Sequence, residues 1–209
     1  MSEESSKPVK KYYDYISVGN RTKQVVYFVE QHDKPVHCEL FLTENPSLPT
    51  VVICKSKKSA DLLGTYLESK NILNIVAHGN HRASQIEDAA NTFNTEENAL
   101  LITTSKIYET LELNKVQRVI NYELPFEPES YFKTLRCVDE VGESILFVSS
   151  DEENMLETLE LMMKYDIPHS EIDSFEHTPL PKTENKKKKK PRHKKSKKQE
   201  SKPEAKKED

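Results

Sequence analysis

The fold is decided by residues 99–125, which read ALLITTSKIYETLELNKVQRVINYELP. This stretch contains two short apolar runs, ALLIT at 99–103 and RVINYE at 118–123, joined by a more polar connection. Short runs rich in β-branched residues and bounded by polar residues are typical of buried parallel strands. Because parallel strands need a crossover connection, and a helical stretch fits at 105–110, these residues predict a unit of an α/β sheet.

The same alternation of apolar runs and amphipathic stretches extends from Gln24 to Lys164 and predicts a mainly parallel sheet with flanking helices. The other expected strands are 24–30, 50–54, 74–78 and 144–149. The expected helices are 34–44, 57–69, 83–95, 105–110, 128–137 and 151–164. Asp151 is placed to cap the last helix. Binding sites in such sheets lie beyond the C-terminal ends of the strands, here in the loops after Cys54, His78, Thr103 and Tyr122.

The chain of 209 residues is long enough for one domain with tails. We assign residues 1–21 to an N-terminal extension, 22–165 to the folded domain, 166–181 to a proline-containing linker and 182–209 to a disordered Lys-rich tail. The tail holds 14 of the 31 Lys/Arg and 5 of the 35 Asp/Glu, a formal charge of +9. The other 17 basic and 30 acidic residues give residues 1–181 a formal −13, so attraction to nucleic acid is expected mainly from the tail.

Cysteine usage and hydropathy limit the cellular compartment. The three cysteines, Cys38, Cys54 and Cys137, are widely spaced and cannot form a fully paired disulfide framework. A reducing, cytoplasmic location is therefore expected, or a nuclear one if the source is eukaryotic. The start of the chain lacks the apolar run of a signal peptide, and no stretch is long enough to span a bilayer, so no membrane partner is expected.

Sequence motifs for nucleotide hydrolysis and metal binding are missing. The chain has only four glycines, Gly19, Gly64, Gly79 and Gly142. These cannot build a G-x-x-x-x-G-K-[ST] loop, so we expect no autonomous nucleotide hydrolysis and no cofactor. His78 and His81 are interpreted as loop histidines, because no cysteine or carboxylate lies near them in the sequence, and no metal site is expected.

Four successive segments resemble the second, C-terminal RecA-like domain of DEAD-box RNA helicases. They are TVVICKSKKSADLL, NIVAHGNHRASQIEDAANTF, ALLITTSKIYETLELNKVQRVINYELPFEPESYF and ESILFVSSDEE. The most specific pieces are KKSADLL after a strand, HG before a helix that ends in Phe93, and VQRVINYELP leading to Tyr131. The resemblance covers roughly residues 22–165 and implies a RecA-like fold.

The chain departs from the family pattern in each of these segments. Where the family has Phe-Val-Asn-Thr, this chain has Ile53, Cys54, Lys55 and Ser56. The family's Gln and Arg in the next helix fall at Ala83 and Ile86, so an anchoring hydrogen-bond network is expected to be absent. The family's Thr-Asp and Ala-Arg-Gly-Leu-Asp align with Thr104, Ser105 and residues 108–112, where an arginine position has become acidic.

The last family motif, His-Arg-Ile-Gly-Arg-Thr-Gly-Arg, aligns with residues 133–140, so its arginine positions hold Thr134, Cys137 and Glu140. A guanidinium stabilises the charge of phosphoryl transfer, which these side chains cannot do. Arg136 could substitute only after a one-residue shift of register. The resemblance therefore implies a helicase-like domain without its catalytic side chains.

The tail is the expected RNA-binding element. Its cationic residues are Lys186, Lys187, Lys188, Lys189, Lys190, Arg192, Lys194, Lys195, Lys197 and Lys198. No aromatic residue is interleaved, so binding should depend on salt and not on sequence. Less favoured RNA contacts, in the loops of the domain, are Lys55, Ser56, Gly79 and Thr104.

Three functional hypotheses remain open. The first is an inactive helicase-like domain that acts as an RNA-associated accessory module, with RNA, a ribonucleoprotein or a protein as its partner. The second is one half of a split ATP-dependent helicase, completed in trans by a chain that brings the nucleotide-binding domain, with ATP as the cofactor only in that case. The third is a protein-only scaffold with an incidental tail.

Overall fold

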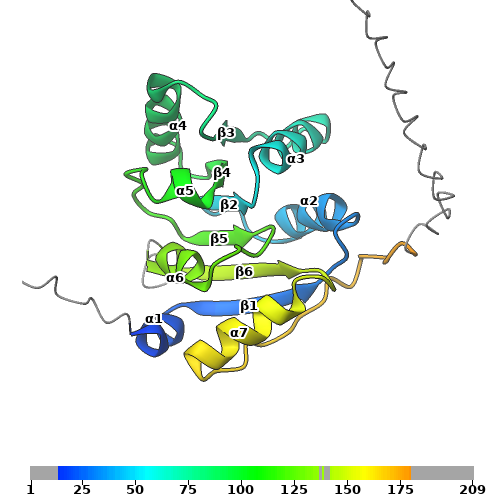
Figure 1. The fold of residues 1–209 in the computed structure, drawn as a ribbon. Helices are drawn as coiled ribbons and strands as arrows, with labels where there is room; N and C mark the ends of the chain where they lie inside the picture. Colours follow the sequence, from blue (N-terminus) through cyan, green and yellow to red (C-terminus); the bar gives the residue numbers. More distant parts are fainter. Residues whose placement is uncertain (1–13, 137, 139–141, 180–209) are drawn as a thin grey trace, which may run out of the picture. The chain divides into compact units, whose positions relative to one another are not determined.

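The computed structural model describes residues 14–136, 138 and 142–179. Their strands form one six-stranded sheet in the order β1-β6-β5-β2-β4-β3, in which each strand runs parallel to its neighbours (Figure 1). The strands are β1 (Lys23–Phe28), β2 (Thr50–Cys54), β3 (Ile75–Ala77), β4 (Leu100–Thr104), β5 (Arg118–Asn121) and β6 (Glu143–Val148). The predicted RecA-like α/β fold with a parallel sheet is confirmed.

The strand order places β2 in the middle of the sheet, between β4 and β5. Val52 of β2 pairs with Ile102 of β4 on one side and with Ile120 of β5 on the other. Because all three strands point the same way, their carboxyl ends meet at one edge. The loops that follow β2, β4 and β5 are thereby brought together, although they lie far apart in the sequence.

Helices cover both faces of the sheet. They are α1 (Tyr15–Arg21), α2 (Lys34–Glu44), α3 (Lys57–Ser69), α4 (Ala83–Thr95), α5 (Ser105–Tyr108), α6 (Pro128–Arg136) and α7 (Glu153–Met163). Helices α2 and α3 pack on the face that contains Val52 and Cys54. The face that contains Val51 and Ile53 packs against α4 and α5, and the same side of β1 and β6 packs against α1, α6 and α7. Successive strand residues therefore enter opposite cores, as the pleat requires.

The predicted bounds of α2, α3 and α4 are confirmed, whereas the last helix begins differently. The side chain of Ser56 accepts a hydrogen bond from the Ser59 N–H at 3.0 Å and so caps α3. The prediction that Asp151 caps α7 is wrong, because the N-cap residue is Glu152. The Asp151 carboxylate instead accepts a hydrogen bond from the Ser149 hydroxyl at 2.7 Å.

Two segments outside residues 22–165 lie against the folded domain. In α1, which we had placed in an N-terminal extension, the ring of Tyr15 packs on Phe132 of α6 with centroids 4.4 Å apart. Beyond α7, the N–H of Val26 donates to the Pro168 carbonyl at 2.9 Å, and the N–H of Ser170 donates to the Val26 carbonyl at 2.8 Å. Residues 168–170, which the sequence places in the linker, therefore pair with the open edge of β1. The tail of residues 182–209 lies outside the described residues.

Candidate functional site

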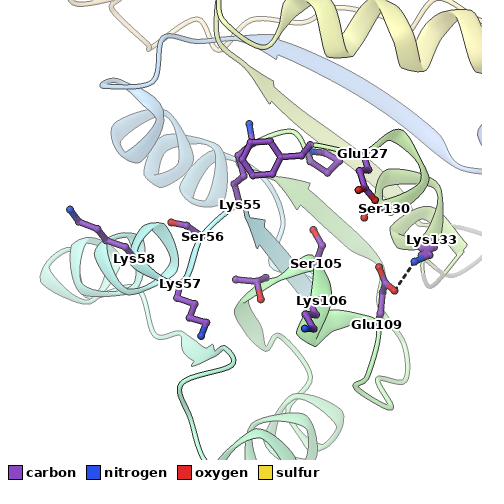
Figure 2. Close-up of a pocket in the computed structure, with 13 residues that line it drawn as sticks. Lys55, Ser56, Lys57, Lys58, Ser105, Lys106, Glu109, Glu127, Ser130 and Lys133 are labelled. Atoms are coloured by element: carbon purple, nitrogen blue, oxygen red, sulfur yellow. Dashed lines mark hydrogen bonds and ion pairs between the residues drawn. The ribbon is translucent and has the colours of Figure 1, made fainter.

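An open pocket of about 920 Å³ lies beyond the carboxyl ends of β2, β4 and β5 (Figure 2). We call it the lysine pocket. Its lining residues are Lys55, Ser56, Lys57, Lys58, Thr104, Ser105, Lys106, Glu109, Pro125, Phe126, Glu127, Ser130 and Lys133. They come from the end of β4, from the loops that follow the three strands, from the first turn of α3, and from α5 and α6. This is the edge at which sheets of this type bind ligands.

The pocket is basic, although the folded part of the chain is acidic as a whole. Five lysines and two glutamates line it. Two of these lysines have a carboxylate nearby, because the ammonium of Lys133 lies 3.0 Å from Glu109 (Figure 2) and that of Lys55 lies 3.9 Å from Glu152. The N-terminus of α3, capped by Ser56, adds the positive end of a 13-residue helix. The pocket is thus suited to an anion such as a phosphate group.

An exposed aromatic ring stands at the rim of the lysine pocket. The side chain of Phe126 is 77% exposed, although it is one of the largest apolar side chains in the chain. The ammonium of Lys55 lies 4.3 Å from the centroid of this ring, within the range of a cation–π contact. The pocket therefore offers a stacking surface next to its charges, a combination typical of sites for single-stranded nucleic acid.

Buried carboxylates hold the floor of the pocket in place. Glu123 lies in the loop after β5. Its side chain accepts hydrogen bonds from the Lys55 N–H at 2.9 Å and from the Gln31 side chain at 3.0 Å. Glu152 lies 3.9 Å from the Lys55 ammonium and forms a fully buried ion pair with Lys34 at 2.5 Å. Glu123 therefore holds the backbone of Lys55, while Glu152 lies near the ammonium of the same residue.

The family of the domain follows from its sequence. A sequence model described as the helicase conserved C-terminal domain matches residues 31–138, about half of the chain. The chain belongs to the helicase C-terminal domain family. The resemblance to the second domain of DEAD-box RNA helicases is thereby confirmed.

Relatives of this helicase C-terminal domain are much longer proteins. The ATP-dependent RNA helicase vasa of Drosophila melanogaster is 28% identical over 138 residues, which are 63% of this chain and 21% of vasa. A DEAD box protein from Methanococcus jannaschii has a TM-score of 0.63 at 23% identity, over 73% of this chain and 43% of that chain. Dbp5 of S. cerevisiae bound to RNA and ADP BeF3 has a TM-score of 0.64 at 19% identity, over 73% of this chain and 41% of that chain. The chain spans about a fifth of the length of vasa and similar relatives.

The positions aligned with the family's arginines lie apart from the lysine pocket or outside the described residues. Thr134 is buried in α6, and its hydroxyl donates to the Ser130 carbonyl at 2.8 Å within the same helix. Arg136, the candidate for a rescue, is exposed at the end of α6 and does not line the pocket. Cys137 and Glu140 lie outside the described residues. None of the described members of this motif takes part in the pocket except Lys133.

The pocket includes three of the four loop residues that the sequence indicated. Lys55, Ser56 and Thr104 line it, whereas Gly79 lies beside it, near the side chain of Lys57. Sequence reasoning missed further residues of the pocket, namely Lys57, Lys58, Lys106, Phe126 and Lys133. The first three could have been found, because each lies within four residues of the end of a strand. None of the described helices is both long and apolar enough to cross a bilayer.

Proposed function

We propose that this helicase C-terminal domain is an RNA-associated accessory module that binds single-stranded RNA and does not hydrolyse ATP. The observation that carries the proposal is the lysine pocket with the exposed ring of Phe126 at its rim. Lysines neutralise phosphates without reading sequence, and an aromatic ring stacks on any base. Dbp5, a structural neighbour, was solved bound to RNA, which supports RNA as the ligand class.

The Lys-rich tail is proposed to extend this binding. Its lysines can follow any phosphate backbone, while the formal −13 of residues 1–181 opposes a polyanion at long range. The pocket overcomes that repulsion only at close range, since charges further apart than about 8 Å are largely screened at physiological salt. We place the protein in the cytoplasm, without a cofactor of its own.

Salt dependence separates the contributions of pocket and tail. For single-stranded RNA, each phosphate contact contributes about 0.7 to the slope of log affinity against log salt. The double variant Lys57→Gln/Lys106→Gln should therefore flatten the slope by up to about 1.4, and serines at 186–190 by up to about 3.5. Phe126→Ala should weaken binding by roughly 5- to 10-fold with an unchanged slope, because it removes stacking and no charge. Fluorescence anisotropy with an unstructured labelled RNA measures all three.

A matched control keeps the same loss of charge away from the pocket. Lys23 and Lys70 are exposed lysines in surface ion pairs with Glu143 and Glu39, and neither lines the pocket. The variant Lys23→Gln/Lys70→Gln should bind RNA almost as the unchanged protein does. Equal slopes for this control and for the pocket variant would show that the lysine pocket is not the RNA site.

We also expect no RNA-stimulated phosphate release from ATP by the purified chain. The sequence contains no P-loop, and Thr134, Cys137 and Glu140 cannot supply the positive charge that an arginine contributes to phosphoryl transfer. A malachite green assay with RNA present and absent measures the release. Activity above the blank that disappears in Arg136→Ala would contradict the proposal and support a catalytic role for Arg136.

A further inference from the structure

Two histidines and a carboxylate, none of which lines the lysine pocket, lie together at the carboxyl end of β3. His78 directly follows the strand, and the N–H of His81 donates to the His78 carbonyl at 2.9 Å in a tight turn. Asp61 belongs to α3 and is 17 residues from His78 in the sequence. No carboxylate lies near the two histidines in the sequence, but Asp61 lies next to His78 in the structure.

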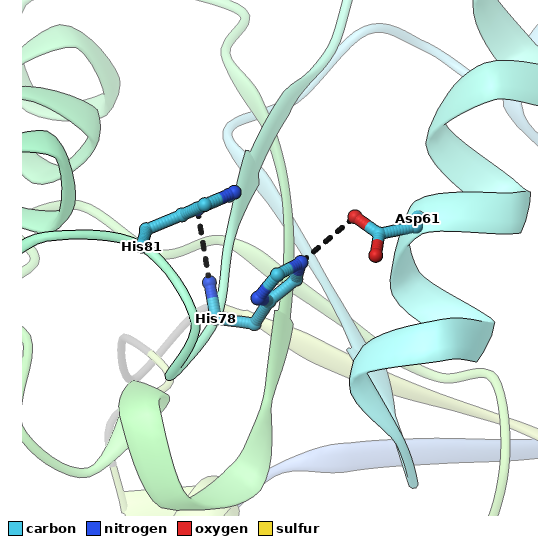
Figure 3. Close-up of side chains that lie close together, drawn as sticks. All are labelled: Asp61, His78 and His81. Carbon is cyan, nitrogen blue, oxygen red and sulfur yellow. Dashed lines mark hydrogen bonds and ion pairs between the residues drawn. The ribbon is translucent and has the colours of Figure 1, made fainter.

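The side chains converge from two elements (Figure 3). Nε2 of His78 lies 2.7 Å from Oδ1 of Asp61. The two imidazole rings stack, with centroids 4.1 Å apart and planes inclined by 24°. One possible ligand atom from each of the three residues lies within 4.8 Å of the other two. In a tetrahedral zinc site the ligand atoms are about 3.3 Å apart, as bond lengths of about 2.0–2.1 Å imply. Binding therefore requires the ligand atoms to approach one another by up to about 1.5 Å, and the His81 ring to leave its stack on His78 so that its nitrogen points at the ion.

We propose that Asp61, His78 and His81 bind a divalent transition-metal ion, for which Zn²⁺ is the best chemical match. Imidazole nitrogens and one carboxylate form a common zinc ligand set, whereas Mg²⁺ and Ca²⁺ prefer oxygen ligands alone. The ion takes the place of the proton between Nε2 of His78 and Asp61, the neutral His78 ring carries its remaining proton on Nδ1 instead, and water fills the fourth position of the ion.

Burial favours such a site on one side and leaves it accessible on the other. The side chain of His78 is 3% exposed, so the ring is held in a fixed place, while that of Asp61 is 58% exposed and reaches solvent. Nδ1 of His78 accepts a hydrogen bond from the backbone N–H of Asn80 at 3.4 Å, and Nδ1 of His81 accepts one from the backbone N–H of His78 at 3.4 Å. Both hydrogen bonds are longer than usual, so little stability is lost when binding of an ion breaks them.

One nearby cation limits the affinity. The ammonium of Lys57 donates to the Asn80 side chain at 2.6 Å, in the turn between the two histidines. Its charge opposes a second cation, although it faces solvent and is screened. The proposal does not depend on RNA binding, because none of the three ligands lines the lysine pocket.

Metal titration of the full, untagged chain tests the proposal. We expect isothermal titration calorimetry to show binding of one Zn²⁺ per chain. Asp61→Asn and His81→Gln should each lower the Zn²⁺ affinity by at least roughly 10-fold. Replacing a residue that only supports a metal ligand already costs about that much affinity, and replacing a ligand should cost more. Both positions are at least partly exposed, so these variants should fold, which circular dichroism checks. His169→Gln, an exposed histidine outside the cluster, is the matched control and should bind like the unchanged protein.

Cobalt distinguishes this cluster from a site that uses cysteine. Co²⁺ bound by nitrogen and oxygen ligands should give weak visible bands, and these bands should vanish in the Asp61→Asn/His81→Gln double variant. A strong thiolate charge-transfer band, unchanged Zn²⁺ affinity in the double variant, or the absence of binding to the unchanged protein would each overturn the proposal.

Discussion

Replacing Glu152 with alanine should lower the free energy of unfolding by about 3–5 kcal/mol, because it leaves a buried ammonium without its counter-charge. The side chain of Lys34 is 0% exposed and that of Glu152 is 5% exposed. Burial lowers the pKa of Lys34 from its ordinary value, and the charge of Glu152 opposes that shift. Glu152 also accepts hydrogen bonds from the N–H groups of Leu124 and Ser149 at 2.8 and 3.3 Å, so the substitution orphans backbone donors as well.

Urea denaturation of four proteins measures the effect. The double variant Lys34→Met/Glu152→Gln removes both charges together, so it should be more stable than Glu152→Ala. Lys23→Met is the surface control, because Lys23 is 72% exposed and its ion pair with Glu143 is worth at most about 1 kcal/mol. If Glu152→Ala costs no more than Lys23→Met, the buried pair contributes nothing to stability.

This ion pair also connects the fold with the candidate site. Lys34 starts α2, Glu152 precedes α7, and Leu124 belongs to the loop after β5. The same Glu152 carboxylate lies 3.9 Å from Lys55 in the lysine pocket. Three segments that are distant in the sequence thus meet at one carboxylate, which lies close to Lys55 of the lysine pocket.

The fold could be predicted from the sequence because its signals are local. The bounds of α3 follow from a capping serine at Ser56 and an amphipathic stretch that ends where polar residues begin. The predicted ends of the strands were less accurate, because the extent of a strand depends on the neighbouring strand with which it pairs. Lys23, for example, joins β1 because it pairs with Glu143 of β6. The short helix α1 was missed, although Asp14 marks its start by accepting a hydrogen bond from the Ser17 N–H at 3.1 Å, and Tyr15 packs on Phe132.

The site could be predicted only in part, because the order of the strands in the sheet cannot be deduced from any single segment of the sequence. Lys55 and Thr104 follow from the rule that ligands bind beyond strand ends. Their closeness to Phe126 and Lys133 depends on β5 lying next to β2, which no local pattern specifies. Average charge was also a poor guide, because a formal −13 over residues 1–181 conceals a local surplus of lysine. The nearness of Asp61 to His78 likewise needed the packing of α3 beside β3.

The last expectation concerns acid stability and a single histidine, His37. It lies in α2, is 2% exposed, and its ring makes edge contacts with the rings of Tyr27, Phe147 and Phe175 at 4.7–5.3 Å between centroids. Its Nδ1 has no hydrogen-bond partner among the described residues. Burial, with a smaller effect of His177, lowers the pKa of His37 from 6.5 to about 4.

A lowered pKa means that the unfolded chain takes up a proton on His37 before the folded protein does. Above pH 6.5 the group is neutral in both states and has no effect on the pH dependence. Between pH 6.5 and about 4 only the unfolded chain is protonated, so stability falls with pH, by about 3 kcal/mol in total. In His37→Phe, which suits the aromatic surroundings and has no group to protonate, this part of the loss should disappear. Urea denaturation at pH 7.5 and at pH 4 measures the free energy of unfolding of both proteins. Carboxyl groups titrate in both, so the difference between the two pH-dependent losses of stability is due to His37. Parallel pH profiles would show that His37 is protonated in the folded state as readily as in the unfolded chain.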